Sequence, residues 1–177
     1  MPNNYYDLDD ILADAEKLPC RFELTVPGLG YLEGNPGKSI KKDTKLELPL
    51  WMAEFLATCL IMGDESPSFI RLEEPDFLNP KVLNAIKSNA TSVDIHSILP
   101  NFYKLIEKWS TMFGNTELIE ITMQMLNERS FEINNYASNT NKNINSNFLF
   151  SLDEFEKYLF KVTTENNKHM RRWINED

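Results

Sequence analysis

Residues 44–62 constrain the fold of this chain most, because the hydrophobic period changes within them. Residues 45–48 alternate polar and apolar side chains, which predicts a strand with one buried face. Pro49 has no amide hydrogen for a sheet ladder, but its fixed φ suits the first turn of a helix. We therefore expect a strand to end and a helix to begin there. Residues 50–62 are apolar on nearly every side, so the helix must be covered on more than one face.

A small β-rich domain is expected over residues 1–48. Asp7 begins a short helix to about Lys17, with carboxylates at its positive N-terminal end. Residues 20–26 alternate apolar and polar side chains, as in a strand with one buried face. A second short strand is expected at Tyr31 and Leu32, between turns rich in glycine and proline. So small a sheet has little core, and we expect it to lean on the helical bundle or on a partner.

Helical patterns dominate the rest, and a helical domain is expected over residues 49–177. A short extended piece is predicted at residues 68–72, followed by a helix over about 76–89. A second helix is predicted to end at Gly114, and a third to run from Asn115 to about residue 136. Residues 134–147 are half asparagine and are expected to form a flexible polar loop. Ser151 and Glu154 have capping-box spacing, which predicts the last helix. The fold class is mainly α, a helical bundle preceded by a small N-terminal β-rich domain, α+β overall.

Charge and cysteine usage exclude several classes of function. A formal net charge of −9 repels phosphate, so no strong direct nucleic-acid binding is expected. Basic side chains gather only within residues 38–45 and around Lys168, Arg171 and Arg172, which leaves DNA contact there as an alternative. The two cysteines form no CxxC pair, which favours reduced thiols. No signal segment and no apolar run of 18 residues is found, which favours an intracellular protein without a membrane span.

The sequence shows no catalytic, cofactor-binding or metal-binding motif. GxSxG, GxxxxGK[ST] and a GxGxxG after a strand are all absent. The two histidines are far apart, without the spacing of metal ligands. Asp94 and His96 are the only candidate catalytic pair in the sequence, and no nucleophile is placed with them. Three tryptophans, eleven phenylalanines and six tyrosines without a catalytic constellation favour a protein that binds other proteins.

Three segments together resemble one family. They are LPC at residues 18–20 with VPGLGYL at 26–32, LELPLWMA at 46–53, and VDIH at 93–96 with PNFY at 100–103. In order and spacing they are similar to the third Psf-type subunit of the GINS complex, in its fungal form. The resemblance runs from the N-terminal helix to about Met125, and LELPLWMA is its most specific element. The C-terminal third matches no motif that can be carried over.

The resemblance implies a non-catalytic structural subunit of GINS, a component of the eukaryotic replicative helicase that acts in initiation and elongation of DNA replication in the nucleus. It implies three sister subunits in an obligate heterotetramer, together with the Mcm helicase ring and a RecJ-like companion protein, and no cofactor. It also implies a small β-rich domain before a helical domain. An obligate assembly would explain an apolar helix at residues 50–62, because such assemblies bury helices that are otherwise sticky.

Aromatic and aliphatic side chains are the candidate protein interface. They are Trp51, Phe55, Phe102, Trp109, Phe155, Leu159 and Trp173. Core burial is the alternative for each of them. The rival function is a stand-alone protein-binding adaptor of another nuclear pathway, which predicts a stable monomer when expressed alone. A GINS subunit is instead expected to be poorly soluble without its sister subunits.

Overall fold

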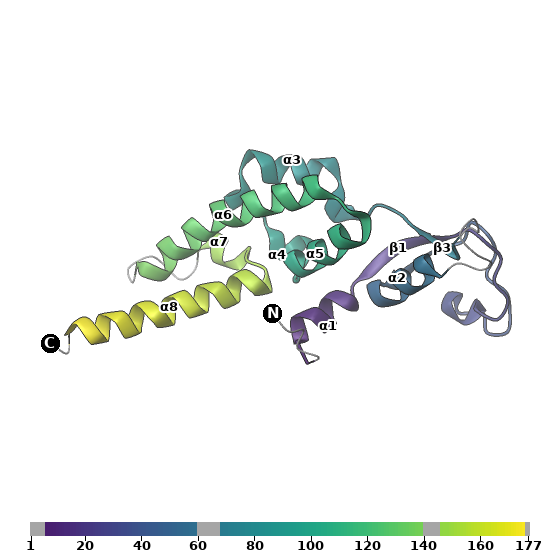
Figure 1. Cartoon of the computed structure of the whole chain (residues 1–177), viewed down its shortest axis with the longest axis horizontal. Coiled ribbons are helices and arrows are strands. Elements are labelled where there is room, and N and C mark those ends of the chain that lie inside the picture. Colours follow the sequence, from purple (N-terminus) through teal and green to yellow (C-terminus); the bar gives the residue numbers. More distant parts are fainter. Residues whose placement is uncertain (1–5, 60–67, 140–145, 176–177) are drawn as a thin grey trace. The chain divides into compact units, whose positions relative to one another are not determined.

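The structure, a computed structural model, describes residues 6–59, 68–139 and 146–175. It divides into two compact units, Met1–Leu78 and Asn79–Asp177 (Figure 1). The division lies well beyond the boundary expected after residue 48. The expected boundary assigned the helix after Pro49 to the helical domain, whereas this helix packs on the small sheet.

The N-terminal unit contains a three-stranded antiparallel sheet with strand order β2-β1-β3. Two α-helices and two short 3-10 helices accompany the sheet in the described part of this unit. In chain order the elements are α1 (Leu8–Asp14), β1 (Lys17–Phe22), η1 (Gly30–Glu33), β2 (Lys45–Pro49), α2 (Leu50–Thr58), β3 (Ile70–Leu72) and η2 (Asp76–Leu78). The register places Cys20 of β1 opposite Leu46 of β2 and Leu72 of β3. The central strand is therefore the first one in the sequence.

The predicted change from strand to helix at Pro49 is confirmed. β2 includes Pro49 as its last residue, and α2 begins at Leu50. The helix ends at Thr58, because Cys59 already has an extended backbone. Residues 60–62 of the expected helix lie outside the described residues. The short extended piece expected near residues 68–72 is confirmed as β3.

The strand expected at Tyr31 and Leu32 is wrong, because these residues lie in η1. The Gly30 N–H donates to the Lys38 carbonyl at 3.0 Å, and the Gly30 carbonyl accepts from the Asn35 N–H at 2.8 Å. A Cβ at Gly30 would lie 2.4 Å from the Asn35 carbonyl oxygen, so only glycine fits here. These local bonds close the chain into a tight turn instead of a second strand.

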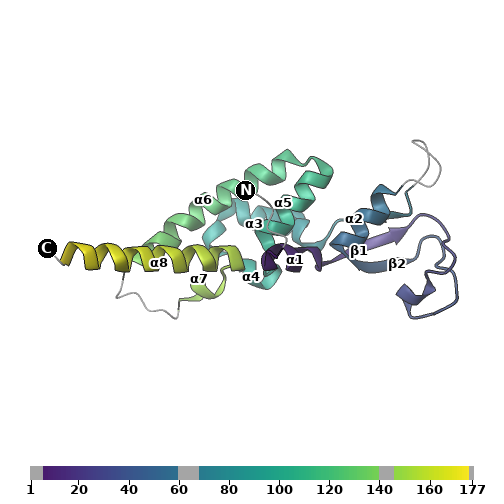
Figure 2. The same cartoon turned by 60° about the horizontal axis from the view of Figure 1, so that its bottom comes forward.

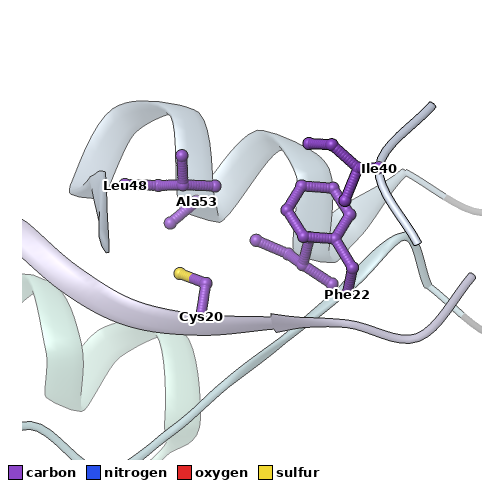
Figure 3. Packing of buried hydrophobic residues seen from close by; sticks show 6 residues of the cluster. Cys20, Phe22, Ile40, Leu48 and Ala53 are labelled. Carbon is purple, nitrogen blue, oxygen red and sulfur yellow. The ribbon is translucent and has the colours of Figure 1, made fainter. Parts of the chain in front are cut away.

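One buried cluster holds the N-terminal unit together. Side chains from all three strands, from α2 and from the loop before β2 form it: Cys20, Phe22, Ile40, Leu48, Ala53 and Ile70. Figure 3 shows α2 lying across the sheet with the cluster between them. Removal of this apolar surface from water is the main stabilising term for so small a sheet. The sheet packs on α2, a helix of its own unit, whereas we expected it to lean on the helical bundle or on a partner.

The C-terminal unit is entirely helical within its described residues. Its elements are α3 (Pro80–Ser88), η3 (Ala90–Ser92), α4 (Ile95–Ile98), α5 (Phe102–Phe113), α6 (Thr116–Ser138), α7 (Asn147–Phe150) and α8 (Glu154–Asn175) (Figure 2). Gly114 ends α5 in the left-handed region at φ 63°. The Asn115 carboxamide caps α6 by accepting from the Leu118 N–H at 3.1 Å. The predicted stop and start at these two residues are confirmed.

The flexible loop expected over residues 134–147 is wrong at both of its ends. α6 continues to Ser138 because Ile133 and Ala137 are buried on its inner side, and this packing outweighs the asparagine-rich composition. Asn147 begins α7. Residues 140–145 of the expected loop lie outside the described residues.

The capping box expected at Ser151 and Glu154 is also wrong, because the cap lies at Asp153. The Asp153 carboxylate accepts from the Glu156 N–H at 2.8 Å. The Ser151 hydroxyl instead donates to the Phe148 carbonyl at 2.8 Å, which binds it to the preceding turn. Among the described residues, no helix is both long and apolar enough to span a bilayer.

Candidate protein-interaction surfaces

Two of the seven candidate interface residues belong to the core. Phe102 is fully buried and Trp109 is 5% exposed. Both lie on α5, whose inner side also buries Leu105 and Ile106. A side chain without accessible surface cannot contact another protein in this conformation. For these two residues, core packing therefore replaces the expected interface role.

Two further candidates, which lie in the N-terminal unit, form an exposed aromatic pair on α2. Trp51 is 55% exposed and Phe55 is 64% exposed, four residues apart on the same side of the helix. Leu50 and Ala53, on the other side, are fully buried. α2 is thus covered by the sheet on one side and presents two aromatic rings to solvent on the other.

α1 carries a second exposed apolar stripe that the sequence reasoning did not select. Leu8, Ile11 and Leu12 are all exposed, whereas Ala13 is buried. Their shared helical face was visible in the spacing of the sequence. The spacing could not show that the described residues leave this face exposed.

α8 presents the remaining candidates along its length. Phe155 is exposed near its start, Leu159 is half-buried, and Trp173 is 69% exposed near its end. The Phe155 ring also meets the Tyr103 ring edge-on, with 5.7 Å between centroids. The structure does not bring Phe155 and Trp173 together, because five turns of helix separate them.

An apolar groove of about 420 Å³ lies beside Phe155. Its walls come from α5, α6 and the first turns of α8, and include Ile106, Ile119, Met123, Leu126 and Phe155. Ile119 and Met123 are exposed apolar side chains on α6. The sequence reasoning missed these two, because they lie beside the buried face of α6.

A buried ion pair fixes the start of α8 against α6. Arg129 and Glu156 are both fully buried. The guanidinium donates from Nε to Oε1 of Glu156 at 2.7 Å and from Nη2 to Oε2 at 2.8 Å. Its Nη1 donates to the carbonyls of Ala90 and Val93 at 2.9 and 3.1 Å, and Nη2 also donates to the Ser151 carbonyl at 3.2 Å. This bidentate, saturated geometry is what a buried pair needs to offset its desolvation.

Two further side chains complete the buried network. The Tyr103 hydroxyl donates to Oε1 of Glu156 at 2.7 Å. Burial raises the pKa of Tyr103 well above its usual range, so the hydroxyl keeps its proton and remains a donor. Burial also raises the pKa of the Asp153 carboxyl to about 7. The network therefore serves to place α8 and its exposed side chains.

The geometry does not support Asp94 and His96 as a catalytic pair. Asp94 caps α4 by accepting from the Ser97 N–H at 3.0 Å. The His96 ring is partly exposed, with Nδ1 3.4 Å from Nζ of Lys157 and 4.0 Å from Oε1 of Glu154. In the described ranges, no three histidine, cysteine, aspartate or glutamate side chains gather as metal ligands would.

A polar groove of about 770 Å³ lies on the outer side of the sheet in the N-terminal unit. Arg21, Lys42 and Arg71 line it together with four carboxylates, Glu23, Asp43, Glu73 and Glu74. Glu73 pairs with both Arg21 and Lys45 at 2.9 Å, and these cations lower the pKa of Glu73. Because carboxylates outnumber the cations, this groove offers little to a phosphate backbone.

Comparison with known proteins gives two family matches. A model of the PSF3 N-terminal domain matches residues 6–58, and a model of the GINS complex protein helical bundle domain matches residues 77–175. The DNA replication complex GINS protein PSF3 of Debaryomyces hansenii is 69% identical, over 98% of this chain and 99% of its own length. Proteins with the same description are 53% identical in Candida albicans, over 98% of both chains, and 40% identical in Saccharomyces cerevisiae, over 96% of this chain and 97% of that one.

Proposed function

This chain belongs to the PSF3 family of GINS subunits, and on that premise we propose that it is a non-catalytic structural subunit of the GINS complex. It acts in the initiation and elongation of DNA replication, in the nucleus, as part of the replicative helicase. The names of its fungal relatives support the complex and the process. Its partners are three sister subunits in an obligate heterotetramer. The Mcm ring and a RecJ-like protein are further partners that the family resemblance implies.

The observation that carries the proposal is the set of large apolar side chains exposed on the helices of both units. Trp51 and Phe55 of α2, Phe155 and Trp173 of α8, and the stripe on α1 are all accessible. Single exposed apolar residues are ordinary, but repeated groups of them at helical spacing mark surfaces that another protein covers. Binding through these surfaces needs no reacting group and no cofactor.

The test is co-expression with the three sister subunits, followed by mass measurement of the purified species. We expect a four-chain complex from the native sequence, and poor solubility of the chain expressed alone. Replacing Trp51 and Phe55 together by serine should reduce the yield of complex, because both rings lose a hydrophobic contact. Tyr31→Ser is the matched control, since Tyr31 is also exposed in this unit but lies in η1.

The rival functions give different results in the same experiment. A stand-alone adaptor would purify as a soluble monomer and leave the sister subunits behind. An enzyme built on Asp94 and His96 would need its imidazole for activity. Retained complex formation and retained cell viability with His96→Ala would therefore leave the enzyme reading without support.

A further inference from the structure

α8 continues past the end of α6, the helix on which it packs (Figures 1 and 2). Its last polar contacts with α6 are both made to Ser138, the final residue of that helix. Asn167 donates to the Ser138 hydroxyl at 3.2 Å, and Arg171 donates to the Ser138 carbonyl at 2.5 Å. Every residue from 168 to 175 is exposed. Apart from this Arg171 bond, about two turns of helix are therefore exposed to solvent at the end of the described chain.

The exposed turns continue an apolar face. Met170, Trp173 and Ile174 are each more than half exposed, at the spacing of three and four residues that places side chains on one side of a helix. Asn167, which contacts α6, lies three residues before Met170 and on the same side. The side of α8 that packs on α6 is thus prolonged beyond it by large apolar residues. This is the spacing with which a helix enters an apolar groove.

The same turns are positively charged in an otherwise acidic chain. Residues 166–175 contain Lys168, Arg171 and Arg172 and no carboxylate, although Glu176 and Asp177 follow. The whole chain has a formal net charge of −9. A cationic segment of this kind is complementary to an acidic surface, which steers association and suppresses wrong partners.

The arrangement of the two faces favours a protein over a nucleic acid as the partner. At 100° per residue, Lys168 and Arg172 lie on the side of α8 opposite to the apolar face that holds Trp173. A single strand that stacked a base on Trp173 would therefore lead its phosphates away from these two cations. An unsupported helix end is also marginal in water, so a packed partner accounts for it better than a loosely held strand.

We propose that residues 168–175 dock through Met170, Trp173 and Ile174 into an apolar groove with an acidic rim on a sister subunit. The inference rests on the proposed function, because it assigns the groove to a member of the same complex. It adds the segment that docks, the anchor residues and the chemistry of the surface that receives them.

Hydrogen exchange of the assembled four-subunit complex tests the proposal. We expect the amides of residues 169–175 to exchange at least about tenfold more slowly in the native complex than in a complex carrying Met170→Ala and Trp173→Ala, because the anchors hold the helix end in place. Lys168→Glu with Arg172→Glu should lose part of the protection, and high salt should weaken it in the native complex. Phe131→Ala is the matched control, because Phe131 is an exposed apolar residue on α6 outside this segment.

Rapid exchange of residues 169–175 in an intact native complex would overturn the proposal. Protection that appears only after a single-stranded oligonucleotide is added, and that vanishes steeply with salt, would reassign the segment to nucleic acid. Failure of the chain to assemble with sister subunits would be seen first, in the mass of the purified species. Failure to assemble would refute both the proposed function and this inference. Rapid exchange in an intact complex, or protection that depends on the oligonucleotide, would refute only this inference.

Discussion

Replacing Glu156 by glutamine removes one charge from the buried pair without changing the shape of the side chain. In the native protein the Glu156 carboxylate accepts two charge-assisted hydrogen bonds from Arg129 and one hydrogen bond from Tyr103. After the substitution the guanidinium stays fully buried, with carbonyl oxygens around it but without its anion. A buried cation that loses its partner is the costly case, because the desolvation penalty remains while the attraction is gone.

The size of the effect follows from the burial of both groups. Breaking a fully buried pair from one side costs about 3–5 kcal/mol. The same carboxylate-to-amide change in an exposed pair costs little, because water screens both charges. Lys87 and Glu117 form such a pair at 3.1 Å, with side chains 47% and 75% exposed. Glu117→Gln is therefore a control with identical chemistry at the surface.

Hydrogen exchange of the assembled complex measures both variants. Amides near Arg129 on α6 and near the start of α8 report the free energy of opening this part of the unit. For Glu156→Gln we expect them to exchange between roughly a hundredfold and a few thousandfold faster. For Glu117→Gln we expect a change of less than about fivefold. Exchange within fivefold of the native rate in Glu156→Gln would refute the view that this pair fixes α8.

Three further outcomes are expected. Burial raises the pKa of Asp153 from 3.8 to about 7, so the free energy of unfolding should fall as the pH rises from about 4 through about 7. Asp153→Asn should flatten this pH dependence, as measured by thermal unfolding of the complex. Gly30→Ala brings a Cβ to 2.4 Å from the Asn35 carbonyl oxygen, so the N-terminal unit should lose about 1–3 kcal/mol and be cut faster by protease. Burial raises the pKa of Cys20 to about 11, so at a pH of about 8 its thiol should react with iodoacetamide roughly a hundredfold more slowly than an ordinary thiol. Mass spectrometry should therefore detect labelling of the half-buried Cys59 before labelling of Cys20.

The elements that the sequence predicted correctly are those with a local physical cause. Pro49 ends β2 because it lacks an amide hydrogen, and its fixed φ suits the start of α2 at Leu50. Gly114 and Asn115 end one helix and cap the next because of a left-handed backbone and a side-chain acceptor. The mainly helical fold with a small N-terminal sheet follows from the same periodic patterns. The family resemblance, which the comparisons confirm, supplied the function that chemistry alone did not.

The elements that the sequence could not predict depend on contacts between distant residues. An apolar face on α5 indicates that something covers it, but the spacing does not say that the chain itself covers Phe102 and Trp109. Both Ser151 and Asp153 precede a glutamate by three residues, and the spacing does not show that distant Arg129 binds the Ser151 carbonyl and Glu156 where Asp153 caps the helix. The assignment of α2 to the sheet likewise depends on β3, which follows it in the chain.

Because β3 follows α2 in the sequence, an expression fragment of the N-terminal unit must extend beyond β3. A fragment that stopped at Thr58, the last residue of α2, would lack Ile70–Leu72 and leave one edge of β1 without its hydrogen-bonding neighbour. The Pro19 carbonyl, the Glu23 amide and the backbone groups of Arg21, which face β3, would be freed and form a template for strands of other molecules, beside a cluster that had lost Ile70. Such a fragment would precipitate, whereas one that extended to Leu78 would keep its sheet closed on that side.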